Sequence, residues 1–251
     1  KAWDLIAEKS CDVRAFVPVS EYYGRLMQER MKLAPGKLHV VPIGINCDDY
    51  EVSRMPPDRP TIGYLSKTCE SLGLGVLVDA FMILKATDRL KNLKLRVMGG
   101  RSREDGPFLR RLVRKLTAAG MVDDVEFCTG FDKTSRTEFL KSLSVMSVPT
   151  PRPEAFGMFV IESLASGVPA VQPDIGAFPE LVEGTGGGIC YRPNSVTALA
   201  GALESLLLDP GRSAEMGRAG RKAVIERFSV KKTTDSMMAV YGSCVPAAGK
   251  P

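Results

Sequence analysis

Apolar residues recur along most of the chain in two alternating patterns, which predict strands and helices in turn. Short apolar runs typical of buried strands stand at 61–65, 93–98, 125–129, 145–148, 170–172 and 188–191. Stretches of helical period lie between and after them, at 73–87, 103–119, 133–142, 158–165, 177–182, 195–208 and 212–228. Strands that alternate with helices of this length require right-handed β-α-β crossovers and pair in parallel. We therefore predict an α/β fold, with a Rossmann-like parallel sheet flanked by helices.

The first 50 residues carry the same alternation on a smaller scale. They are expected to hold a helix at 3–9, a strand at 15–19, a helix at 21–33 and a strand at 38–43. Ser20 ends the first of these strands and can cap the helix that follows it. Two strands do not complete a sheet, so this unit looks like the end of a domain.

The most informative stretch is 149–169, PTPRPEAFGMFVIESLASGVP. Its three early prolines fit neither a helix nor a central strand, so a rigid loop delivers Glu154 and the turn residue Gly157. A helix begins there, and its free amides attract an anion, usually a phosphate. Glu162, two turns beyond Glu154, can accept hydrogen bonds from neutral hydroxyls. Hydroxyls beside a phosphate suggest a sugar nucleotide.

Glu154 and Glu162 stand eight positions apart with FG between them, which resembles the E-x7-E motif of glycosyltransferase family 4, whose members are retaining and have the GT-B fold. The bare spacing is common on helices, but the surrounding prolines and glycines make this stretch far more specific. The resemblance implies that Glu154 contacts the donor sugar and that Glu162 holds the ribose. It also implies that the backbone of Gly157, Met158 and Phe159 receives the diphosphate. The alternative is an amphipathic helix with two solvated glutamates.

The same resemblance assigns further donor-site residues to the ends of other strands. Lys67 stands in for a family cation that neutralises the diphosphate, although a solvated loop lysine is the alternative. The family's second cation is missing, because Leu72 precedes Gly73 where a lysine is expected. The remaining expected donor-binding residues are Phe156, Gly63, Gly99, Gly130, Phe131 and Gly44.

Several of these positions have a simpler alternative. Gly130 and Phe131 resemble the loop that frames the nucleotide base, but a turn capped by Asp132 fits equally well. Gly44 suits a hinge between domains or a plain turn. Glu180 resembles the glutamate of a family turn, and it is as well suited to cap its own helix.

The resemblance also implies a second Rossmann-like domain, which the first 50 residues are too short to form. We assign four segments: 1–50 as the end of an N-terminal acceptor-side domain, 51–60 as a linker, 61–228 as the nucleotide-sugar donor domain, and 229–251 as a C-terminal helix with a disordered tail. The missing N-terminal domain is therefore an expected partner.

Composition narrows the range of partners. The net charge of +5 suits an anionic nucleotide or a membrane surface, and the single Trp argues against nucleic-acid binding. The six cysteines include no C-x-x-C pair, so we expect no metal site and reduced thiols in the cytoplasm. No apolar run approaches the roughly 20 residues that a membrane span needs, which leaves peripheral contact with an inner membrane face.

The predicted reaction is transfer of a sugar from a nucleotide-diphosphate sugar to an acceptor hydroxyl, with retention of configuration and without a metal or other cofactor. The acceptor would be a glycan, a lipid or a small molecule. Glu154 and Lys67 would be catalytic through positioning and charge stabilisation rather than strong base chemistry. Two alternatives stand beside it: a non-catalytic nucleotide-sugar-binding module, and a sugar-nucleotide epimerase, which stretch 149–169 fits poorly.

Overall fold

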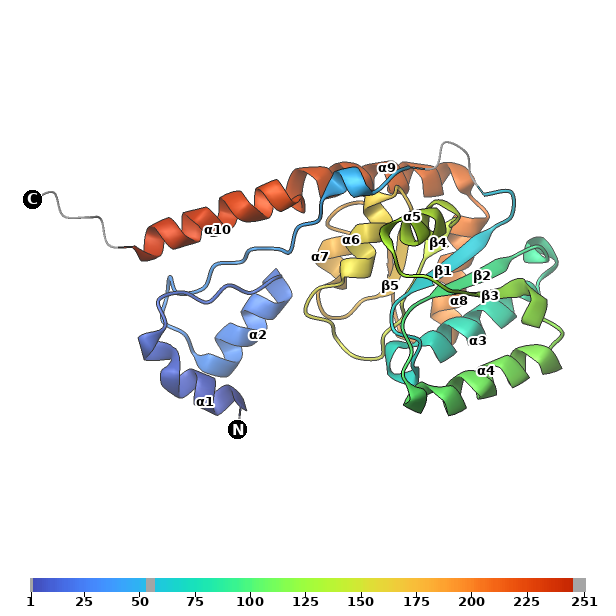
Figure 1. Cartoon of the computed structure of the whole chain (residues 1–251), viewed down its shortest axis with the longest axis horizontal. Helices are drawn as coiled ribbons and strands as arrows, with labels where there is room; N and C mark the ends of the chain where they lie inside the picture. The colour runs from blue at the N-terminus through green and yellow to red at the C-terminus, as the bar shows by residue number, and fades with distance from the viewer. Residues whose placement is uncertain (1, 53–56, 246–251) are drawn as a thin grey trace, which may run out of the picture.

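A computed structural model of the protein describes residues 2–52 and 57–245. Six parallel strands form one sheet in the order β3-β2-β1-β4-β5-β6 (Figure 1). They are β1 (Thr61–Leu65), β2 (Lys94–Met98), β3 (Val125–Cys128), β4 (Val145–Met146), β5 (Ala170–Pro173) and β6 (Gly188–Tyr191). The predicted α/β fold with a Rossmann-like parallel sheet is confirmed. The strand order reverses between β1 and β4, and open parallel sheets bind their ligands at such a switch point.

Helices cover both faces of the sheet (Figure 1). One face carries α3 (Leu74–Lys85), α4 (Gly106–Ala118) and α8 (Val196–Leu207). The other carries α5 (Lys133–Lys141), α6 (Met158–Ala165), α7 (Phe178–Val182) and α9 (Pro210–Arg227). Helices α3 and α8 pack against each other, as do α6 and α9. Because both faces are covered, the central strands are apolar at nearly every position, as in other buried parallel sheets.

Strand β1 is buried at all five positions. Gly63 lies at its centre, where a Cβ atom would collide with the side chain of Leu143. This glycine therefore allows close packing on the sheet. Our expectation that Gly63 binds the donor stays a prediction, and its position is buried in the sheet.

The first residues form a small unit beside the sheet. Helix α1 (Ala2–Glu8) packs against α2 (Glu21–Met31), and Ser20 caps α2 as predicted. The strands expected at 15–19 and 38–43 are reduced to one parallel bridge between Phe16 and Leu38. A pair of strands is marginal without a third neighbour, which explains why this expectation was wrong.

The chain returns to this small unit through α10 (Val230–Cys244), which extends away from the sheet (Figure 1). At the crossing, the amide of Ile45 donates to the carbonyl of Phe228 at 2.9 Å. Gly44 precedes this contact, and a Cβ atom there would lie 2.6 Å from the backbone oxygen of Ser229. Gly44 therefore serves the contact between two chain segments. Its expected role in donor binding stays a prediction.

Parts of the predicted segments lie outside the described residues, namely 53–56 of the linker and 246–251 of the tail. Among the helices of residues 2–52 and 57–245, none is both long and apolar enough to cross a membrane.

Candidate functional site

The loops that follow β1 and β4 meet at the switch point of the sheet. Gly73 begins α3 with a left-handed φ of 80°, and a Cβ atom there would collide with the backbone carbonyl of Pro149. Both the positive φ and the close approach require glycine at this position. The first loop carries Lys67 and the second carries Glu154, so the fold brings these two segments to the same edge.

The start of α6 presents unpaired amides at this edge. Gly157 is the N-cap residue, with a φ of 152°. Val160 N and Ile161 N both reach back to the carbonyl of Gly157. The amides of Met158 and Phe159 donate to no group within the part of the chain that the structure describes. Such amides at the beginning of a helix attract an anion.

Aromatic side chains anchor the turn that leads into α6. Phe156 is buried, and its ring centroid lies 6.1 Å from that of Phe228. Phe159 is partly buried, 5.9 Å from the ring of Phe178. The side chain of Phe156 therefore fixes the turn from within the core. Its expected place among the donor-binding residues stays a prediction, although its ring is buried.

Glu154 combines a fixed backbone with an unengaged carboxylate. Ala177 N donates to Glu154 O at 3.0 Å, and Gly176, with a φ of 62°, packs against the same peptide units. The half-buried carboxylate makes no hydrogen bond or ion pair within residues 2–52 and 57–245. Burial raises the pKa of Glu154, because desolvation penalises the charged form. A carboxylate in such a state is a candidate ligand-binding group.

Glu162, by contrast, is held by two donors. Its side chain is 9% exposed, and Oε1 accepts hydrogen bonds from Arg136 Nη1 at 2.6 Å and from the Tyr50 hydroxyl at 3.0 Å. Oε2 has no partner among the described residues. Burial and the neighbouring Glu162 charge raise the pKa of Tyr50 above its ordinary value, so the phenol remains a donor. Oε1 of Glu162 therefore accepts two hydrogen bonds, and Oε2 can accept one from a further donor.

The sequence did not predict the partners of Glu162. Tyr50 and Arg136 stand 112 and 26 positions away from it, which gives no periodic signal. Tyr50 follows the 3-10 turn Cys47–Asp49, and its carbonyl accepts a hydrogen bond from Arg221 Nη1 at 3.0 Å. An aromatic residue directly before the predicted linker was the available hint.

Lys67 lies in the loop after β1, where its Nζ is 3.4 Å from Asp105 Oδ2. Hydrogen bonds from Ser102 are the main reason that the pKa of Asp105 is lowered. The Lys67 side chain is about half exposed, and ion pairs of this kind are weak, so the ammonium group is accessible to an anion.

Gly99 lies beside this pair, directly after β2. A Cβ atom on it would collide with the backbone carbonyl of Ser66. The glycine thus lets two protein loops approach each other. Its expected role in approaching a ligand stays a prediction.

The loop after β3 forms a capped turn. Gly130 has a φ of 102°, and Asp132 caps α5 by accepting a hydrogen bond from Ser135 N at 3.0 Å. The capped turn is therefore present, and the expected role of this loop in framing the nucleotide base stays a prediction. Phe131 is 50% exposed, which leaves its ring and backbone accessible from solvent.

Glu180 and Ser20 join the small first unit to the motif stretch. Glu180 accepts hydrogen bonds from the amides of Glu21 at 2.9 Å and Tyr22 at 3.0 Å, so it caps α2 rather than its own helix. Ser20 Oγ donates to the carbonyl of Ala155 at 2.6 Å. Residues before 50 therefore contact the loop that holds Glu154.

Comparisons with known proteins place this chain in a family. Residues 48–223 match the family Glycosyl transferases group 1. A GDP-mannose-dependent alpha-(1-6)-phosphatidylinositol monomannoside mannosyltransferase of Mycobacterium tuberculosis (strain CDC 1551 / Oshkosh) is 30% identical over 177 residues, which are 68% of this chain and 44% of that protein. The chain spans about half the length of the curated relatives it matches.

Solved structures share the fold. A glycosyltransferase from Rickettsia africae ESF-5 superposes with a TM-score of 0.83 at 20% identity, over 96% of this chain and 66% of that one. Anabaena HepE in complex with UDP and glucose gives 0.80 at 17% identity, with the same two coverages. The expected GT-B type of fold is thus confirmed. Because the family match covers well over half of its residues, this chain belongs to the group 1 glycosyl transferases.

Proposed function

We propose that this chain supplies the donor site of a glycosyltransferase that transfers a sugar from a nucleotide-diphosphate sugar to an acceptor hydroxyl. The observation that carries the proposal is the arrangement around α6. Unpaired amides at its start lie between two glutamates along the chain. Glu154 has a carboxylate without a hydrogen-bond partner among the described residues, and Glu162 has a carboxylate that is held by Tyr50 and Arg136. Related proteins support the ligand class, since one is named as GDP-mannose-dependent and another was solved with UDP and glucose.

Each group has a proposed role. The amides of Met158 and Phe159, together with Lys67, hold the diphosphate. Glu154 accepts hydrogen bonds from the sugar hydroxyls, and Oε2 of Glu162 accepts them from the ribose. The exposed loop at Phe131 frames the base.

The proposed reaction retains the anomeric configuration and uses no metal. The bond between the anomeric carbon and the diphosphate breaks with its electron pair on the diphosphate, which leaves an oxocarbenium-like sugar. The acceptor hydroxyl bonds to the same face, and a diphosphate oxygen takes its proton. Negative charge grows on the leaving group, so preorganised amides and Lys67 stabilise the transition state.

The segment assignment belongs to the same proposal. Residues 61–228 would form the donor domain, and 1–50 would be the end of an acceptor-side domain that is completed by residues outside this chain. The acceptor would be a glycan, a lipid or a small molecule. A second candidate is a non-catalytic nucleotide-sugar-binding module, which Leu72 favours because it replaces a family cation. Turnover after addition of an acceptor-side domain would separate the two.

Calorimetric titration tests the donor site with four ligands: UDP, GDP, UDP-glucose and GDP-mannose. Glu162→Ala should weaken a bound nucleoside diphosphate and its sugar conjugate equally, by about 10- to 150-fold, since a hydrogen bond to a carboxylate is worth about 1.5–3 kcal/mol. Glu154→Ala should weaken only the conjugate. The matched control is Glu215→Ala, which removes an exposed glutamate of α9. Negligible losses from both site variants would refute the assignment.

Thermal melting in EDTA tests separately whether the donor site binds its ligand without a metal. A nucleoside diphosphate at 100 times its Kd should stabilise the fold by about 2.7 kcal/mol. Stabilisation that requires added magnesium or manganese would contradict a metal-independent site.

A further inference from the structure

A second, differently built site lies along the first half of α4. A cavity of about 710 Å³ opens between this helix and the loop that precedes it. Its lining includes four arginines and two apolar residues, Arg101, Arg103, Arg110, Arg114, Leu109 and Val113. No aspartate or glutamate lines it. The cavity therefore combines strong positive charge with an apolar floor.

The four guanidinium groups have no partner of their own. Within residues 2–52 and 57–245, none of them takes part in a side-chain hydrogen bond or an ion pair. The neighbouring cations on the same helix differ, because Arg111 lies 3.1 Å from Glu70 and Lys115 pairs with Asp79. Asp105, next to the cavity, is turned toward Ser102. The positive charge of the cavity is thus left uncompensated by the protein.

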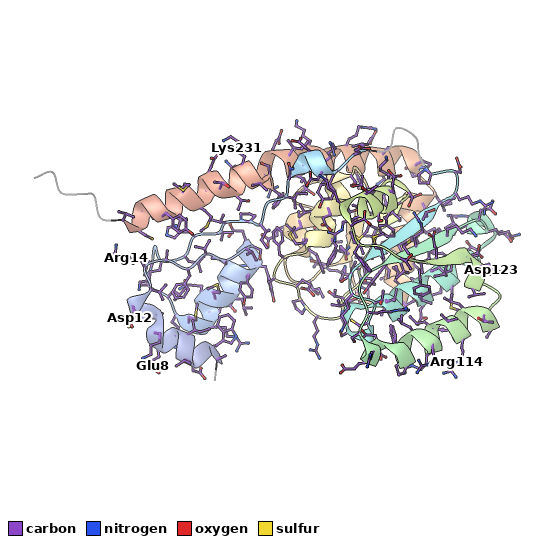
Figure 2. The ribbon with its side chains drawn as sticks, viewed as in Figure 1. Glu8, Asp12, Arg14, Arg114, Asp123 and Lys231 are labelled. Atoms are coloured by element: carbon purple, nitrogen blue, oxygen red, sulfur yellow. The ribbon has the colours of Figure 1, made fainter. Side chains whose placement is uncertain are left out.

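Helical spacing explains how this charge is gathered. Arg110 and Arg114 are four residues apart, so they lie on one face of α4, and Val113 lies beside them. Figure 2 places Arg114 on the outer side of α4, away from the sheet. Val113 is 38% exposed, so an apolar side chain is accessible among the guanidinium groups.

Guanidinium groups bind phosphate with two parallel hydrogen bonds, and their mutual repulsion is relieved when an anion lies between them. Four guanidinium groups spread over an open surface offer more hydrogen-bond donors than one small phosphate ester can use. The exposed apolar side chain among them is more stable in contact with hydrocarbon than in contact with water.

We propose that this arginine face of α4, defined by Arg101, Arg103, Arg110, Arg114 and Val113, docks onto the phosphate headgroups of an anionic bilayer. The helix begins directly after the loop that carries Asp105, the partner of Lys67. Docking therefore brings the edge of the sheet that bears the candidate site close to the membrane surface. The docking itself does not depend on sugar transfer, because it is measured without donor or acceptor.

Sedimentation with vesicles tests the proposal. The chain should bind vesicles of phosphatidylcholine with 30% phosphatidylglycerol, and binding should be lost with phosphatidylcholine alone. Each basic residue at an anionic surface changes the partition coefficient by about fivefold, so Arg110→Gln with Arg114→Gln should weaken binding by about 25-fold. The matched control is Arg111→Gln with Lys115→Gln, which removes the same charge at the same spacing from the same helix. It should weaken binding by about threefold or less, because those two cations are already paired.

A fluorescence measurement locates the contact. Val113→Trp in a Trp3→Phe background gives a single reporter, since Trp3 is the one tryptophan of the chain. Its emission should shift to the blue on anionic vesicles, and circular dichroism confirms that each variant is folded. Equal losses from the two double variants would overturn the proposal, as would an unshifted emission. Binding of glycerol 3-phosphate without vesicle binding would also overturn it, since the site would then serve a soluble phosphate ester.

Discussion

Removal of the Tyr50 hydroxyl offers a direct test of how Glu162 is held. Tyr50→Phe keeps the ring and deletes one hydrogen bond of 3.0 Å to Oε1. Arg136 remains on the same oxygen at 2.6 Å, so the carboxylate keeps one donor. The change therefore isolates a single contact between Tyr50 and α6.

The magnitude follows from burial and charge. A hydrogen bond to a charged group contributes about 1.5–3 kcal/mol, and we expect about 1.5 kcal/mol here because Arg136 shares the acceptor oxygen. The ion pair between Arg136 and Glu162 should contribute less to stability than its distance of 2.6 Å suggests. The Arg136 side chain is 38% exposed, so solvent screens its attraction for Glu162.

The assay is urea denaturation at pH 7 of the wild type, Tyr50→Phe, Glu162→Ala and the double variant. In the Glu162→Ala background, Tyr50→Phe should cost almost nothing, so the coupling energy should be about 1–1.5 kcal/mol. Tyr23→Phe is the matched control, because that hydroxyl makes no hydrogen bond within the described residues. A coupling energy below about 0.5 kcal/mol would mean that the two changes are additive, and it would refute the contact.

A pH series extends the same test. The folded-state pKa of Tyr50 is raised, first by burial and then by Glu162. The unfolded phenol ionises near pH 10, while the folded one stays protonated. The contribution of Tyr50 to stability is therefore fully present below about pH 10 and is lost above it. Tyr50→Phe should lack this loss, and parallel curves for the two proteins would contradict the assignment.

Two further predictions concern the loop that carries Glu154. Burial raises the folded-state pKa of Glu154, so its contribution to stability is present below its unfolded pKa, about 4.3, and is lost as the pH rises through the folded value. Glu154→Gln should therefore raise the unfolding free energy at pH 7 and have little effect on it near pH 4. Urea titrations in which the variant has a lower unfolding free energy at pH 7 would contradict this. Ser20→Ala removes the cap of α2 and the hydrogen bond to Ala155, and it should lower the unfolding free energy by about 2 kcal/mol. Ser20→Thr keeps the hydroxyl and should restore most of the loss, whereas no rescue would argue against both bonds.

For the sheet and the helices that flank it, the sequence by itself determined the order and type of the elements. Apolar runs and helical periods depend on neighbouring residues, so they predicted each strand of the sheet and the helices between them. Prolines and glycines in 149–169 are likewise local signals, and α6 begins at Met158, directly after the predicted turn. Strands that alternate with helices are joined by β-α-β crossovers, and these connections pair strands in parallel.

Only the tertiary structure decided which distant groups meet. The roles of Gly44, Gly63 and Gly99 depend on segments that approach them from elsewhere in the chain, so a glycine looks the same in the sequence whether it faces a ligand or a packed loop. Glu180 was suited to its own helix, yet the fold places it against the amides of α2.

The same holds for Glu162, whose two donors are Tyr50 and Arg136 of α5. A buried carboxylate must find partners or stay costly, but a linear sequence does not tell which donors will be within 3 Å. The periodicity of apolar residues in a segment predicts which of its own faces is buried. The pairing of polar groups is settled only when segments far apart in sequence are packed together, because hydrogen bonds act over a few ångströms of space.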